Sequence, residues 1–219
     1  MIVVGIVGGV ASGKSLVCAQ LAQLGAHVLA ADPLGHAALR DAAIKRTLVA
    51  RWGDQVLGAD GEIDRPAVAR LVFAPGTAGL QERRFLEQLV HPWIEARLRT
   101  ALTTLAEQEP QAVVVLDAAL LVEAGWTDLC DVLVYVDAPA DQRRKRAAGR
   151  GWSQADWEGR EAAQASLAKK RELAHWTLDN SASSAETYTQ VLELWKRLRF
   201  DGHPPVSGSG TSDLFPDPT

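Results

Sequence analysis

The sequence has few cysteines and no long apolar run. Cys18 and Cys130 each stand in an apolar stretch, and neither belongs to the paired CxxC spacing that binds a metal or forms a redox couple. No segment approaches the roughly 20 apolar residues that a membrane-spanning helix needs. The apolar N-terminus also lacks the basic region and cleavage site of a signal peptide. These absences favour a reduced, cytoplasmic protein that does not enter a membrane.

An excess of charge of one sign is also lacking. The formal net charge is −4 and charged residues make up 23% of the chain, which excludes a globally basic nucleic-acid binder and an acidic disordered polymer. Hydrophobic residues make up 47% of the 219 residues, enough for one well-buried α/β domain. We expect a single compact enzyme, a monomer or weak homo-oligomer, whose anion site is built locally.

Short apolar runs predict the strands of this domain. They are rich in β-branched residues, as in parallel strands buried on both faces, and they cover residues 2–7, 27–31, 111–116 and 132–136. Asp32, Asp117 and Asp137 follow the last three runs. Helical patterns separate the runs, which predicts an α/β fold with a mainly parallel sheet, and ligands bind at the carboxyl ends of such strands. We therefore expect the three carboxylates to face one crevice.

A phosphate-binding loop follows the first strand. It matches GxxxxGK[ST] and precedes an amphipathic helix, the context in which this motif is specific. Backbone N–H groups and the helix N-terminus would surround the phosphates of ATP, Lys14 would reach the β- and γ-phosphates, and Ser15 would ligate Mg²⁺. The predicted nucleotide-binding residues here are Gly8, Gly9, Val10, Ala11, Ser12, Gly13, Lys14, Ser15 and Leu16.

The loop predicts a P-loop NTPase fold, with helices flanking the sheet and with insertions. We assign a core to residues 1–32, 110–138 and 176–200, and a helical acceptor-binding insertion to 33–105. A helical lid is expected over 139–175. The Pro-, Gly- and Ser-rich tail, 201–219, is expected to be disordered.

The order of further motifs resembles the dephospho-CoA kinase family. The matching segments are GIVGGVASGKSLV, VLAADPLGH, IDR with VFAPG, LEQLVHPWI, LDAALLVEAG and TLDNS, and they extend from residue 2 to about 198. The resemblance implies transfer of the γ-phosphoryl group of ATP to the ribose 3′-hydroxyl of dephospho-CoA, giving coenzyme A and ADP. It implies ATP and Mg²⁺ as cofactors and dephospho-CoA as the acceptor, while the acidic charge of the chain argues against a nucleic-acid partner.

Two carboxylates are candidates for the chemistry. Asp32 matches the second aspartate of the family's DAD signature and would orient the acceptor hydroxyl and take its proton. Alternatively, Asp32 only caps the following helix, with Pro33 in the first turn. Asp117 would hold Mg²⁺ directly or through water, or it only ends its strand.

Arginines crowd the expected lid. Arg143 and Arg146 are predicted to neutralise the transferring phosphoryl group, together with Lys14, and Arg150 to contact the nucleotide. Their spacing suggests that all three arginines share one helical face. The alternatives are a solvated charged face and, less in keeping with an acidic chain, a nucleic-acid contact.

Acceptor-binding residues rest on the resemblance. His91 and Pro92 resemble the family's HP element, although a histidine among Leu89, Val90 and Trp93 is often a packing residue. Asp32, Arg65 and Glu123 also match family positions and are predicted to contact the acceptor.

Some positions depart from the family pattern. Ala30 replaces the first aspartate of DAD, Ala119 replaces a proline, and Leu16 replaces a threonine. Ala11 stands where glycine is common, and its methyl group predicts an ordinary negative φ. Two other functions stay open: another small-metabolite or nucleoside kinase, which would lack the HP and DNS elements, and an ATP-binding regulatory module without phosphoryl transfer, which needs no acceptor-side carboxylate.

Overall fold

The structure is a computed structural model that describes residues 1–200. The tail for which disorder is expected, 201–219, lies outside the described residues. The chain forms two compact units, one built from residues 1–29 and the chain from 102 onward, the other from residues 30–101. The second range overlaps the acceptor insertion expected at 33–105.

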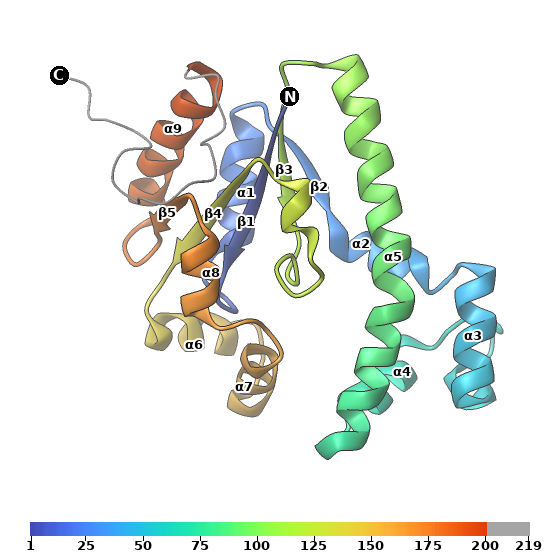
Figure 1. The fold of residues 1–219 in the computed structure, drawn as a ribbon. Helices are drawn as coiled ribbons and strands as arrows, with labels where there is room; N and C mark the ends of the chain where they lie inside the picture. The colour runs from blue at the N-terminus through green and yellow to red at the C-terminus, as the bar shows by residue number, and fades with distance from the viewer. Residues whose placement is uncertain (201–219) are drawn as a thin grey trace. The chain divides into compact units, whose positions relative to one another are not determined.

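A five-stranded sheet organises the first unit, in the order β2-β3-β1-β4-β5 (Figure 1). The strands are β1 (Ile2–Gly8), β2 (His27–Ala30), β3 (Val113–Asp117), β4 (Val132–Asp137) and β5 (Trp176–Asp179). β1 pairs in parallel with β3 and β4, and β4 with β5. The sheet and its flanking helices confirm the predicted α/β class.

Two helices cover one face of the sheet beside β1. They are α1 (Lys14–Gln23) and α9 (Ser184–Phe200), and α9 was expected at 185–199. Val17 and Leu21 of α1 and Val191 and Leu194 of α9 pack with the β-branched residues of β1, β3 and β4 in one buried cluster. Burying each such side chain contributes about 1.5–3 kcal/mol, so this core fixes where β1 ends and α1 begins.

The expected lid consists of three short helices. α6 (Ala140–Ala148), α7 (Gln154–Ala162) and α8 (Leu167–Leu173) follow β4 in turn. Ser153 begins α7 with a capping box, because its hydroxyl accepts from Asp156 N–H while the Asp156 carboxylate accepts from Ser153 N–H. The chain then enters β5, an edge strand that the apolar pattern did not predict.

The second unit is helical, as expected. It contains α2 (Ala31–Ala38), α3 (Ala42–Trp52), the 3₁₀ turn Asp54–Val56, α4 (Arg65–Val72) and most of α5 (Gly76–Gln108). Asp41 caps α3 and also accepts from Trp93 Nε1 at 2.9 Å, which ties α3 to α5. Ile44, Leu48 and Val68 belong to a separate buried core.

The structure also corrects one boundary. The second strand was expected to run to Ala31 and end at Asp32, but β2 ends at Ala30 and α2 begins at Ala31.

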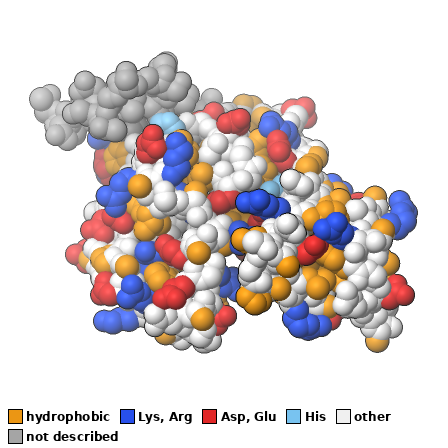
Figure 2. Space-filling model, turned by 60° about the horizontal axis from the view of Figure 1, so that its bottom comes forward, with side chains coloured by type: hydrophobic (Ala, Val, Ile, Leu, Met, Phe, Trp, Pro, Cys, Tyr) orange, Lys and Arg blue, Asp and Glu red, His pale blue; other side chains and the backbone are white. Residues whose placement is uncertain are grey.

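On the face drawn in Figure 2, lysine and arginine side chains are interspersed with aspartate and glutamate side chains. Among residues 1–200, no helix is both long and apolar enough to cross a membrane.

Candidate functional site

The predicted phosphate loop joins β1 to α1. Gly8 and Gly13 have φ angles of 154° and 107°. A Cβ on Gly8 would lie 2.6 Å from the Val136 carbonyl oxygen, and one on Gly13 would collide with the Asn180 amide. Glycine is therefore required at both ends of the loop.

Ala11 contradicts the negative φ expected for it. Its φ is 61°, the one positive value among the non-glycine residues of the described chain. An L-residue in this conformation costs about 1–2 kcal/mol. The methyl group packs in a buried cluster with Val10, Ala147 and Trp157, and this burial offsets the strain. Packing from α6 and α7 thus overrides the local preference of alanine.

Lys14 points back over the loop. Its Nζ donates to the carbonyl oxygens of Gly8 at 3.2 Å and Gly9 at 3.0 Å. Burial, and then the nearby Lys170 ammonium, lower the pKa of Lys14 to about 8. Leu16 is half-buried and Ser15 exposed in the first turn of α1. The loop also holds the Ser12 hydroxyl, which is buried without a hydrogen-bond partner among residues 1–200.

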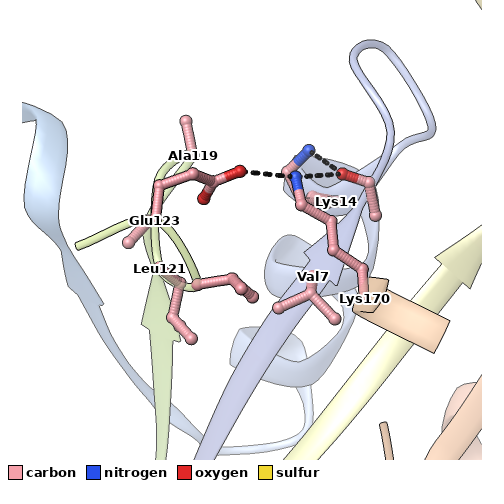
Figure 3. A pocket seen from close by; sticks show the side chains of 9 residues that line it. Val7, Lys14, Ala119, Leu121, Glu123 and Lys170 are labelled. Carbon is pink, nitrogen blue, oxygen red and sulfur yellow. Dashed lines mark hydrogen bonds and ion pairs between the residues drawn. The ribbon is translucent and has the colours of Figure 1, made fainter. Parts of the chain in front are cut away.

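A small pocket adjoins Lys14 at the carboxyl end of β3. About 150 Å³ of space, part of it open to solvent, lies among its lining residues, which are Val7, Gly8, Lys14, Ala118, Ala119, Leu121, Val122, Glu123 and Lys170. Figure 3 shows the side chains of Lys14, Glu123 and Lys170 meeting at its polar end. Glu123 Oε1 accepts from Ala165 N–H at 2.6 Å and pairs with Lys170 Nζ at 3.2 Å. Glu123 Oε2 is buried without a partner among residues 1–200.

Asp117 ends β3, as predicted, and its carboxylate is one of the charges that act on Lys14. The same negative charge also acts on the Cys18 thiol. Burial and then Asp117 raise the pKa of Cys18, so Cys18 remains a thiol. Asp117 and Ser15 offer oxygen donors, the ligand type that Mg²⁺ prefers.

Arg143 lies against the phosphate loop and is 4% exposed. Its Nη1 donates to the Val10 carbonyl oxygen at 3.4 Å and to both carboxylate oxygens of Glu161 at 2.7 Å. Glu161 Oε2 in turn accepts from Val10 N–H at 3.2 Å. A carboxylate of α7 therefore accepts a hydrogen bond from one of the loop's own N–H groups.

Arg146 and Asn180 hold the other side of the loop. The Ser12 carbonyl oxygen accepts from Arg146 Nη1 at 3.1 Å and from Asn180 Nδ2 at 2.7 Å. Asn180 Oδ1 accepts from the Thr187 hydroxyl at 2.9 Å, and Arg146 Nη2 donates to the Asn180 carbonyl oxygen at 2.8 Å. The TLDNS segment thus joins the loop to α6 and α9.

Arg150 departs from the expected pattern. α6 ends at Ala148, so Arg150 stands in the turn after the helix and does not continue the face of Arg143 and Arg146. Its guanidinium lies 6.0 Å from the Trp152 ring centroid. Gly149 and Gly151 flank it and account for the early end of the helix.

The remaining predicted residues belong to the second unit. Asp32 is exposed in the first turn of α2, whose N-cap is Ala30, so the expected alternative of an Asp32 cap is wrong. Arg65 is the exposed first residue of α4. His91 is half-buried in α5 beside Pro92; burial lowers the pKa of His91, and the Glu87 charge opposes this.

Three residues at the site were not predicted. Lys170 and Glu161 lie in charged helical segments that read as solvated faces, and nothing in their spacing distinguishes them. Asn180 could have been found from the sequence, because it lies in TLDNS, one of the segments that resemble the family.

Comparisons with known proteins agree with this geometry. Residues 2–186 match the family model described as dephospho-CoA kinase. A dephospho-CoA kinase from Geobacter metallireducens is 39% identical over 198 residues, which cover 90% of this chain and 96% of the relative. A crystal structure of TT1252 from Thermus thermophilus superposes with a TM-score of 0.74 at 33% identity, covering 89% of this chain and 95% of that one. For a dephospho-CoA kinase from Campylobacter jejuni the TM-score is 0.69 at 19% identity, with coverages of 92% and 98%, a likeness of fold. The chain belongs to the dephospho-CoA kinase family of P-loop kinases.

Proposed function

We propose that the protein transfers the γ-phosphoryl group of ATP to the ribose 3′-hydroxyl of dephospho-CoA, giving coenzyme A and ADP. Membership of the family, by a match over residues 2–186, is the observation that carries this proposal. The site supports it with a glycine loop, a lysine and two arginines around a helix N-terminus, the arrangement that binds transferable phosphates.

The loop and its neighbours bind and stabilise charge. N–H groups of the loop and the buried Ser12 hydroxyl would donate to phosphate oxygens, and Lys14 would exchange the carbonyl oxygens of Gly8 and Gly9 for the β- and γ-phosphates. Arg143 and Arg146 would offset the charge that develops on the transferring group, and Arg150 would contact the nucleotide. In the reaction, the bond from the acceptor oxygen to the γ-phosphorus forms while the bond from that phosphorus to the β,γ-bridging oxygen breaks.

Mg²⁺ fits the donor set. Within residues 1–200, no group of three or more His, Cys, Asp or Glu side chains could hold a metal ion by itself. Magnesium in kinases is held by one or two protein oxygens together with the substrate phosphates, so Ser15 and Asp117 suffice as its protein ligands. Bound there, the ion would neutralise charge between the β- and γ-phosphates.

The proposed acceptor contacts follow from the family resemblance of individual residues. Asp32 would accept the proton of the 3′-hydroxyl and orient its oxygen for attack. Arg65, His91 and Pro92 are the proposed acceptor contacts in the second unit. In the first unit, Glu123 Oε2 is buried with no partner among the described residues, and it is available to an acceptor hydroxyl.

Acceptor turnover tests the proposal. Purified protein with ATP and Mg²⁺ should form ADP with dephospho-CoA, and much less with adenosine or shikimate. The product should be phosphorylated at the 3′-oxygen, as mass spectrometry and ³¹P NMR would show. Equal rates with all three acceptors would overturn the acceptor assignment, and ADP formation independent of any acceptor would indicate an ATPase.

We place the reaction in the cytoplasm, in keeping with the free thiols of Cys18 and Cys130.

A further inference from the structure

Two ammonium groups share one carbonyl of the phosphate loop. The Gly8 oxygen accepts from Lys14 Nζ at 3.2 Å and from Lys170 Nζ at 3.5 Å (Figure 3). Lys170 is 2% exposed, among the most buried side chains of the described chain, and it comes from α8, far from the loop in sequence. Lysine is rarely buried this deeply without a specific partner, so its position needs an explanation.

The two lysines are anchored differently. Lys170 Nζ also donates to Gln164 Oε1 at 2.6 Å and pairs with Glu123 Oε1 at 3.2 Å, so three acceptors match its three N–H donors. The hydrogen bonds of Lys14 go to the loop carbonyls of Gly8 and Gly9. Lys14 can exchange those carbonyls for phosphate oxygens, whereas Lys170 is fixed by side chains outside the loop.

We propose that Lys170 is a positioning residue for nucleotide binding that acts through Lys14. When the ammonium of Lys14 moves from the loop to the phosphates, Lys170 keeps a donor on the Gly8 carbonyl and holds the loop open toward the ligand. Like-charge repulsion between the two ammonium groups also favours the position in which Lys14 has left the loop carbonyls and contacts the phosphates. Glu123 and Gln164 serve to hold Lys170 in place. The proposal rests on the ATP-binding half of the proposed function and is independent of the acceptor.

The neighbouring lysine gives a matched control. Lys169 is exposed on the same helix and pairs with Glu172 at the surface, at 3.1 Å. In calorimetric titrations with ATP and Mg²⁺, Lys170→Met should weaken binding about tenfold, and Lys169→Met less than twofold. Equal effects of the two substitutions would overturn the proposal. Circular dichroism and thermal unfolding would establish that the variants are folded.

A double-mutant cycle separates positioning from simple structural support. If Lys170 acts through Lys14, the tenfold effect of Lys170→Met should shrink to less than about twofold in a Lys14→Met background. The same fold-loss in both backgrounds would show that Lys170 acts independently of Lys14, and the proposal would be wrong.

A second variant removes the buried charge left by the first. Lys170→Met alone leaves the buried Glu123 carboxylate without its ion-pair partner, and an unpaired buried charge can prevent folding. The pair Lys170→Met with Glu123→Gln removes both charges and should fold, yet still bind ATP about tenfold more weakly than the wild type. Wild-type affinity in this pair would mean that Lys170 only neutralises Glu123, against the proposal. These readouts need no acceptor, so failure of dephospho-CoA turnover would leave this inference standing.

Discussion

Glu161 and Arg143 form an ion pair against the phosphate loop, with Arg143 Nη1 2.7 Å from each carboxylate oxygen. The same carboxylate accepts from Val10 N–H at 3.2 Å. In the described conformation, Glu161 therefore engages a loop donor and an arginine that both suit a phosphate oxygen. A negative charge at this place opposes the arrival of ATP.

Glu161→Gln should tighten ATP binding. Removing one negative charge a few ångströms from the loop should lower the dissociation constant about threefold or more, because Coulomb energies at this range are about 1 kcal/mol or larger in a partly buried site. Glu158 supplies the control, since it is exposed on the same helix and accepts from Gln154 at 2.7 Å. Glu158→Gln should change the constant less than about twofold. Unchanged or weaker binding by Glu161→Gln would show that Glu161 supports the site.

Asn180→Ala should lower the stability of the protein and weaken ATP binding at the phosphate loop. Asn180 is 2% exposed, and its amide joins the Ser12 carbonyl to the Thr187 hydroxyl. Losing the side chain leaves two buried polar groups without this partner, which should lower the free energy of unfolding by about 1–3 kcal/mol and raise the KM for ATP. Urea denaturation and steady-state kinetics measure the two effects.

Thr187→Val gives the comparison for Asn180. It removes one hydrogen bond to Asn180 but leaves the bond from Asn180 to Ser12, so it should destabilise the protein and change the KM for ATP less than Asn180→Ala does. If both substitutions raise the KM equally, Asn180 does not act through the loop.

Four of the five strands, including the edge strand β2, were predictable from the sequence, whereas the edge strand β5 was not. β1, β3 and β4 are continuous apolar runs because their residues are buried on both sides. β5 is short, lies at the edge of the sheet and reads WTLD, with one buried residue, Leu178. Nothing in that pattern distinguishes it from a loop.

The loop itself was predictable, but the contacts around it came from tertiary packing. GxxxxGK[ST] specifies the turn and Lys14, since those residue types are what the backbone geometry requires. The positive φ of Ala11 depends on Trp157 and Ala147, more than 130 residues away. Lys170 belongs to a lysine- and arginine-rich run, and only its burial reveals that it is not a surface residue.

Asp32→Asn should separate catalysis from nucleotide binding. If the carboxylate takes the proton of the acceptor hydroxyl, kcat should fall by about 10²- to 10⁴-fold, because the interaction matters in the transition state. The dissociation constant for ATP should stay unchanged. Asp54, an exposed carboxylate of the same unit, gives the control, and Asp54→Asn should leave kcat as in the wild type. A wild-type kcat for Asp32→Asn would remove Asp32 from the mechanism.

Stability should decrease in mild acid because of His175. Its Nδ1 accepts from Leu133 N–H at 2.9 Å, a bond that requires the ring nitrogen to be unprotonated, and burial lowers the pKa of His175. The unfolded chain takes up the proton near the usual value of about 6.5, so it binds more protons than the folded chain as pH falls below that value. This contribution to stability is complete above pH 6.5 and is lost as pH falls toward the lowered pKa of the folded state.

His175→Gln should flatten that dependence. The glutamine amide oxygen can still accept from Leu133 N–H but does not titrate, so the free energy of unfolding should fall less between about pH 7 and pH 5 than in the wild type. Burial also lowers the pKa of His91, which accounts for a slope that remains. Urea denaturation at a series of pH values measures the slope, and an undiminished slope in His175→Gln would contradict the assignment to His175.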